Sequence, residues 1–165
     1  MIIEPISKRH NRKVFDCGDE EVTRFLQEHA LQDHDKNLSR TMVMVDEEVD
    51  PDIIIGYHTL LLVQVRQEDL PRDRPRIKRD IPVILLGQLG VDRAFQGKGY
   101  GDYLLMDAQA RVSEISRRTG VRGLVLDARN ERLVSWYEKH DFVRFPGRLR
   151  MYKGIDLIRK LELTK

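Results

Sequence analysis

The sequence predicts an α/β fold of the α+β type, in which helices flank one mixed central β-sheet. Segments rich in β-branched and large apolar residues alternate with segments whose apolar residues recur at helical spacing. The 165-residue chain is 41% hydrophobic and 34% charged, which predicts one globular domain over residues 1–165. Its longest apolar runs are too short to span a bilayer, and its N-terminus lacks the apolar stretch of a signal peptide. We therefore expect a cytoplasmic protein with no membrane partner.

The first 65 residues are expected to form a strand, a helix and two more strands. Ile2, Ile3 and Ile6 indicate the first strand. Asp19 is a good N-cap, and Glu20 suits the first turn of the helix that follows it. The next expected elements are a strand over Thr41 to Val45, an acidic turn over Asp46 to Pro51 and a long strand over Ile53 to Val65.

The longest predicted helix covers Gly99 to Thr119. It carries a stripe of apolar residues at helical spacing, and Gly120 is placed to end it. A loop over Leu70 to Pro75 and a strand over Ile81 to Val91 are expected before it. The remaining expected elements are a strand over Val121 to Leu126, a helix from Asn130 to Asp141, strands over Phe142 to Phe145 and Leu149 to Lys153, and a short helix over Ile155 to Leu161.

A glycine-punctuated turn joins the predicted strand that ends at Val91 to the longest predicted helix. Such a turn directs free backbone N–H groups and the positive end of a helix dipole at one point, which is a site for an anion such as a diphosphate. The chain contains no Gly-x-x-x-x-Gly-Lys-Ser/Thr segment, which excludes a P-loop. A dinucleotide fingerprint fails as well, because the third glycine, Gly101, comes one residue too soon. The alternative is a tight connection with no ligand.

The spacing of Gln96, Gly99 and Gly101 resembles the Q/R-x-x-G-x-G/A signature of the GNAT superfamily of N-acetyltransferases. A second stretch, Trp136-Tyr137-Glu138-Lys139-His140-Asp141-Phe142 preceded by Asn130, resembles the late helix of that family. Asp141 stands where the family usually has glycine. The resemblance implies a fold in which two splayed strands hold acetyl-CoA as cosubstrate, with no metal. It also implies that Tyr137 is the general acid that protonates the departing CoA sulfur.

Motifs of the N-terminal half resemble a narrower group, the GNAT toxins of bacterial toxin–antitoxin systems. They are Phe15-Asp16-Cys17-Gly18, Ser39-Arg40-Thr41, Ile55-Gly56-Tyr57 and Ile81-Pro82-Val83-Ile84-Leu85-Leu86-Gly87. Gln88 and Gly90 depart from this group, which usually has Arg and Ala there. The resemblance implies acetylation of the α-amino group of aminoacyl-tRNA and a small DNA-binding antitoxin as partner. A homodimer is an expectation from the resemblance alone.

The resemblance also implies a set of acetyl-CoA-binding residues. They are Leu89, Val91, Gln96, Gly97, Lys98, Gly99, Tyr100, Gly101, Asp102 and Asn130. The backbone N–H of Val91 would stabilise the oxyanion that forms as the amine attacks. Two of these residues have an equally good structural explanation, since Lys98 can point to solvent and Asn130 can serve only as an N-cap.

A predominantly basic segment contains the expected substrate-binding residues Arg74, Arg76, Lys78 and Arg79. Such a segment is either a solvated surface or a contact for a polyanion such as RNA, and the toxin resemblance favours RNA. The single Cys17 excludes an internal disulfide and is expected to be a small buried residue rather than a nucleophile. His58, Glu21 and Asp127 are the right residue types for a general base, but their spacing singles out none of them.

Two competing functions are compatible with these patterns. One is a GNAT enzyme that acetylates another amine, such as a polyamine, an antibiotic, a peptide or a protein N-terminus. The other is a non-catalytic domain that binds CoA or RNA. Tyr137 argues against the non-catalytic alternative, because a phenol with a reference pKa near ~10 stays protonated at neutral pH and can act as an acid.

Overall fold

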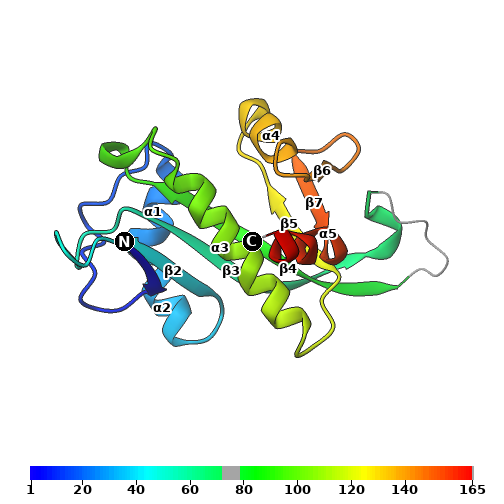
Figure 1. Cartoon of the computed structure of the whole chain (residues 1–165), viewed down its shortest axis with the longest axis horizontal. Helices are drawn as coiled ribbons and strands as arrows, with labels where there is room; N and C mark the ends of the chain where they lie inside the picture. The colour runs from blue at the N-terminus through cyan, green and yellow to red at the C-terminus, as the bar shows by residue number, and fades with distance from the viewer. Residues whose placement is uncertain (72–78, 165) are drawn as a thin grey trace. The chain divides into compact units, whose positions relative to one another are not determined.

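The computed structural model describes residues 1–71 and 79–164, and its strands form a seven-stranded mixed sheet in the order β1-β2-β3-β4-β5-β7-β6 (Figure 1). The strands are β1 (Ile2–Pro5), β2 (Arg40–Val45), β3 (Gly56–Arg66), β4 (Asp80–Val91), β5 (Gly123–Asp127), β6 (Val143–Arg144) and β7 (Arg150–Gly154). The α-helices are α1 (Glu20–Glu28), α2 (Ala30–Asp35), α3 (Tyr100–Ser116), α4 (Glu131–Glu138) and α5 (Ile155–Lys160). The predicted fold class is confirmed.

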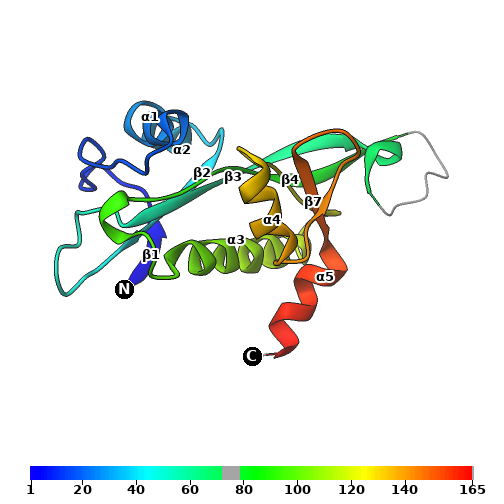
Figure 2. The same cartoon turned by 90° about the horizontal axis from the view of Figure 1, so that it is seen from above.

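The chain divides into two compact units. The boundaries between them fall within β3, β4 and α3, so each of these elements has residues in both units. The first unit comprises Met1–Leu61 and Gly87–Ala108. Within it, α1 and α2 cover one face of β2 and β3, while the first half of α3 covers the opposite face (Figure 2). β1 pairs antiparallel with β2, and β2 pairs antiparallel with β3.

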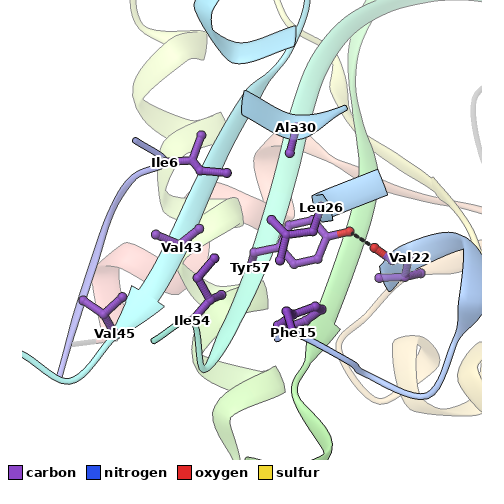
Figure 3. Packing of buried hydrophobic residues seen from close by; sticks show 9 residues of the cluster. All are labelled: Ile6, Phe15, Val22, Leu26, Ala30, Val43, Val45, Ile54 and Tyr57. Carbon is purple, nitrogen blue, oxygen red and sulfur yellow. Dashed lines mark hydrogen bonds between the residues drawn. The ribbon is translucent and has the colours of Figure 1, made fainter. Parts of the chain in front are cut away.

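One apolar core of the first unit lies beneath α1 and α2 (Figure 3). Phe15 and Tyr57 are fully buried and meet edge to face, with ring centroids 5.5 Å apart. The Tyr57 hydroxyl donates a hydrogen bond to the carbonyl of Val22, which satisfies the one polar group of this ring. Burial raises the pKa of Tyr57, so the ring stays neutral and belongs to the core rather than to a reactive site.

The second unit comprises Leu62–Leu86 and Gln109–Lys165. Here β4 pairs parallel with β5, and β5 pairs antiparallel with β7. A parallel pair needs a crossover connection, and α3 supplies it between β4 and β5. The apolar core of this unit gathers around Val83, Val125 and Tyr152.

Most predicted elements are present with shifted ends. The expected long strand begins at Gly56 rather than Ile53, because Ile53 forms only an isolated bridge with Asn11. The short helix α2 was not expected from the sequence. Among the described residues, no helix has both the length and the apolar character required to cross a membrane. Part of the predicted loop over Leu70 to Pro75 lies outside the described residues.

Candidate active site

A turn with two left-handed glycines joins β4 to α3. Gly97 has a φ of 77° and Gly99 a φ of 84°. A Cβ atom added at either position would meet no heavy atom within 4 Å, so the backbone conformation rather than lack of space requires glycine here. α3 begins at Tyr100, and the first N–H groups of an α-helix point out of its N-terminus. This backbone suits an anion such as a diphosphate.

Gln96 secures this turn with its side chain. Its Nε2 atom donates to the carbonyl oxygen of Val91 at 2.9 Å and to that of Cys17 at 2.8 Å. Asp92 supports the same region, because its carboxylate accepts from the backbone N–H of Ala94 at 2.9 Å and of Asp16 at 3.0 Å. The side chain of Gln96 therefore holds the loop in shape.

The other residues of this unit that are expected to bind acetyl-CoA lie in three settings: the apolar core, the first turn of α3 and the loop before it. Leu89, Val91 and Tyr100 pack their side chains against a core formed by Met44, Ile55 and Leu104. Tyr100, Gly101 and Asp102 are the first three residues of α3. The ammonium group of Lys98 lies 5.9 Å from the centre of the Phe95 ring, an arrangement typical of a cation–π contact.

The packing around Gly90 explains why glycine, rather than the usual alanine, stands at this position. A Cβ atom there would lie 2.8 Å from Cγ1 of Val22 and 3.3 Å from Sγ of Cys17. The usual alanine would therefore clash unless the Val22 side chain shifted, and glycine lets Val22 and Cys17 approach the backbone of β4 closely. Cys17 is only half-buried, where the sequence predicted a buried residue.

Tyr137 lies on α4 in the second unit, with only 7% of its surface exposed. Its ring is flanked by those of Trp136, at 4.8 Å between centroids, and Phe142, at 5.6 Å, both edge to face. Burial raises the pKa of Tyr137, since the charged phenolate is disfavoured away from water. Tyr137 is therefore protonated at neutral pH, as a general acid must be.

Asn130 caps α4. Its Oδ1 atom accepts a hydrogen bond from the backbone N–H of Leu133 at 2.9 Å. At the other end of the helix, Asp141 adopts a φ of 68° in place of the family's usual glycine. The left-handed turn therefore survives the substitution, because Asp tolerates this conformation better than most non-glycine residues.

The three residues of suitable type for a general base differ in burial and in their partners. His58 is fully buried, and its Nε2 atom is 2.7 Å from Oδ2 of Asp107. Asp127 pairs with Arg150 through two hydrogen bonds of 2.8 and 2.9 Å, and this contact holds the pKa of Asp127 below its usual range. Glu21 is exposed in the first turn of α1.

Arg79 is exposed, and its carbonyl oxygen accepts a hydrogen bond from the backbone N–H of Gln67 at 3.0 Å. The remaining expected substrate-binding residues, Arg74, Arg76 and Lys78, lie outside the described residues. Sequence patterns did not find the His58–Asp107 pair or the buried Lys153. Their partners are 49 and 44 positions away in the chain, so only the folded structure connects them.

The family model "Acetyltransferase (GNAT) domain" matches residues 37–144, more than half of the chain. The chain belongs to the GNAT family. It is a GNAT enzyme and thus an N-acetyltransferase that uses acetyl-CoA as acetyl donor. No group of three or more His, Cys, Asp or Glu residues is placed to hold a metal ion within residues 1–71 and 79–164.

Two curated GNAT relatives are toxins by name. A protein named "Probable toxin TacT" from Sinorhizobium fredii is 30% identical over 97% of this chain and 94% of its own length. A protein named "tRNA-acetylating toxin" from Mycobacterium tuberculosis is 31% identical over 78% of this chain and 75% of its own length.

Two solved structures give the same picture of the fold. A Tyr-to-Phe mutant of KacT superposes with a TM-score of 0.89 at 26% identity and covers 97% of this chain and 98% of its own. AtaT complexed with acetyl-methionyl-tRNAfMet superposes with a TM-score of 0.87 at 26% identity, with 98% of each chain covered. The GNAT fold therefore extends over nearly the whole chain.

Proposed function

We propose that this GNAT enzyme acetylates the α-amino group of aminoacyl-tRNA and thereby blocks translation. The observation that carries the proposal is the likeness, over 98% of the chain, to AtaT, whose structure holds acetyl-methionyl-tRNAfMet. The relative named tRNA-acetylating toxin supports the same substrate class. Because charged tRNA occurs in the cytoplasm, we place the reaction there.

In this proposal the glycine loop binds the diphosphate of acetyl-CoA. The backbone N–H groups from Gly97 through Asp102 donate to its oxygens, with Gln96 holding the loop in shape. Leu89 and Val91 lie along the acetyl-CoA arm at the end of β4, and the N–H of Val91 donates to the carbonyl oxygen as negative charge develops there.

Tyr137 is the proton donor in this proposal. The acceptor amine forms a bond to the acetyl carbon, the bond from that carbon to sulfur breaks, and the Tyr137 hydroxyl gives its proton to the departing sulfur. We assign no general base, because His58 and Asp127 are already engaged by Asp107 and Arg150. The amine loses its proton to water, since the α-amine of an aminoacyl ester is less basic than that of lysine.

The basic segment that contains Arg74, Arg76, Lys78 and Arg79 is proposed to contact the tRNA backbone. We also propose a small DNA-binding antitoxin as partner. This is supported by the structures of AtaT with the C-terminus of the antitoxin AtaR and of the KacTA–DNA complex. A homodimer is part of the same proposal.

A reconstituted translation reaction tests the proposal. The chain should stop protein synthesis only when acetyl-CoA is present, and the Tyr137→Phe variant should leave synthesis running. Alanine at Arg74, Arg76, Lys78 and Arg79 together should raise KM for charged tRNA and leave KM for acetyl-CoA unchanged. Translation that continues at full rate with the native chain and acetyl-CoA would exclude the proposed function.

A further inference from the structure

Lys153 is a buried cation in the second unit that the proposed reaction does not use. It lies on β7 with 2% of its surface exposed, and its Nζ atom donates to Oε1 of Gln109 at 2.6 Å. Gln109, on α3, is equally buried. Lysine is seldom fully buried, because its charged form loses water and must regain partners inside the protein. A lysine kept in this position therefore calls for an explanation beyond packing.

The ammonium group of Lys153 lies over the ring of Phe142, which follows the helix that carries Tyr137. It lies 5.7 Å from the centre of the Phe142 ring, within the range of a cation–π contact. Phe142 is 2% exposed, packs edge to face on the Tyr137 ring and donates its backbone N–H to the Tyr137 carbonyl at 3.2 Å. A continuous series of contacts thus runs from Lys153 through Phe142 to Tyr137.

Asp141 adds a second link to the same cation. It holds the left-handed turn between α4 and Phe142, where glycine would adopt this conformation without strain. Burial lowers the pKa of Lys153, whereas the negative charge of Asp141 acts in the opposite direction. The negative charge of Asp141 therefore favours the protonated form of Lys153.

We propose that Lys153 is a positioning residue for Tyr137. It fixes the ring of Phe142 and balances the charge of Asp141, so that the turn keeps the Tyr137 ring in one orientation. This inference rests on the proposed role of Tyr137 as proton donor. Lys153 acts on the reaction only through Phe142 and the turn.

The test compares Lys153→Met, which keeps an unbranched side chain one atom shorter and removes its charge, with Lys139→Met, which changes an exposed lysine next to the same turn. Lys153→Met should lower kcat for acetyl transfer about 10-fold, since small displacements of a catalytic group are costly. KM for acetyl-CoA should stay within about two-fold, because the proposed diphosphate site is elsewhere. Lys139→Met should keep native values of both.

A spectroscopic signal reports the aromatic cluster directly. Trp136 is the only tryptophan of the chain and packs on Tyr137. Its fluorescence and near-ultraviolet circular dichroism should change in Lys153→Met while the far-ultraviolet spectrum stays native. Gln109→Met, which removes the acceptor of the ammonium group, should cause the same change and serves where Lys153→Met fails to fold.

Two combined variants distinguish positioning from general stability. In Lys153→Met with Asp141→Gly, the turn no longer needs the cation, so kcat should recover to within about two-fold of the native value. In a Tyr137→Phe background, Lys153→Met should lower kcat no further, because both changes act on one group. A native kcat in Lys153→Met would overturn the role of Lys153 and leave the proposed function intact. The same would follow if Lys153→Met lowered kcat by the same factor in the native chain and in Tyr137→Phe. A native kcat in Tyr137→Phe would instead overturn the proton donor, and the inference with it.

Discussion

The loop at residues 96–99 and the helix that carries Tyr137 differ in which part of the residue performs the proposed chemistry. The loop offers backbone N–H groups, and Gly97 and Gly99 supply the left-handed conformations that direct them. α4 offers one hydroxyl group, on a buried tyrosine ring that packs edge to face on two other aromatic rings. Binding by backbone groups spreads over several residues, whereas proton donation depends on a single atom. Substitutions in the loop should therefore weaken acetyl-CoA binding, whereas substitution of Tyr137 should lower kcat.

The largest expected effect is that of Tyr137→Phe. Removing the hydroxyl should lower kcat by about 10²–10⁴-fold, because the departing thiolate loses its proton donor. The dissociation constant of acetyl-CoA should stay within about two-fold, as the ring itself remains in place. Stopped-flow transfer and equilibrium binding measure the two quantities separately. Weaker acetyl-CoA binding with an unchanged kcat would mean that Tyr137 binds the cosubstrate, as the loop is proposed to do, and does not donate the proton.

Gly99→Ala should produce the opposite pattern. Alanine at a φ of 84° is strained by about 1–2 kcal/mol, so the free loop should relax to another conformation. Restoring the binding conformation should then weaken acetyl-CoA binding roughly 10-fold. The value of kcat at saturating acetyl-CoA should stay native. Gly120→Ala is the matched control, since Gly120 has equally open surroundings and does not adopt a left-handed conformation. Equal binding by both variants would mean that the backbone conformation at Gly99 does not matter to the ligand.

A smaller effect is expected from Gln96→Leu, which removes both hydrogen bonds from Nε2 to the carbonyls of Val91 and Cys17. Losing exposed bonds of this kind should weaken acetyl-CoA binding about five-fold. Gln27→Leu is the control, because the Nε2 atom of Gln27 donates to the carbonyls of Lys13 and Phe15, both in the N-terminal segment. If both variants bind acetyl-CoA equally weakly, the loss comes from a disturbed N-terminal segment and not from the glycine loop.

The smallest expected effect is on the pH profile. Burial raises the pKa of Tyr137 above its ordinary value of 10.0, so the ring keeps its proton as the pH rises. We therefore expect kcat to stay within about two-fold between pH 7.5 and 9.5, with no descending limb. Single-turnover measurements over seconds avoid alkaline hydrolysis of the aminoacyl ester. A descending limb below pH 9 would mean that another group donates the proton.

The sequence predicts the loop better than it predicts the surroundings of Tyr137. Spacing along one short segment is enough to identify Gln96, Gly99 and Gly101, because the residues that shape the turn are close neighbours. Asp19 and Asn130 were likewise recognisable as N-caps, since a cap depends on the next three residues. Local chemistry is therefore enough to predict these features.

What the sequence did not predict depends on contacts between distant segments. Lys153 reads as the end of an ordinary strand, and only the fold places it against Gln109 and Phe142. His58 likewise meets Asp107 across 49 positions. The helix α2 escaped prediction because it spans six residues, of which Ala30 alone is buried, so it shows no apolar stripe.

The most direct test of the proposed function is transfer of labelled acetyl from acetyl-CoA to a pool of charged tRNAs. Polyamines, aminoglycosides and peptides are offered in parallel reactions. We expect label on the α-amino nitrogen of the aminoacyl group, and almost none with Tyr137→Phe. Label only on a small amine or a peptide would contradict the proposed substrate, although the enzyme would remain an acetyltransferase.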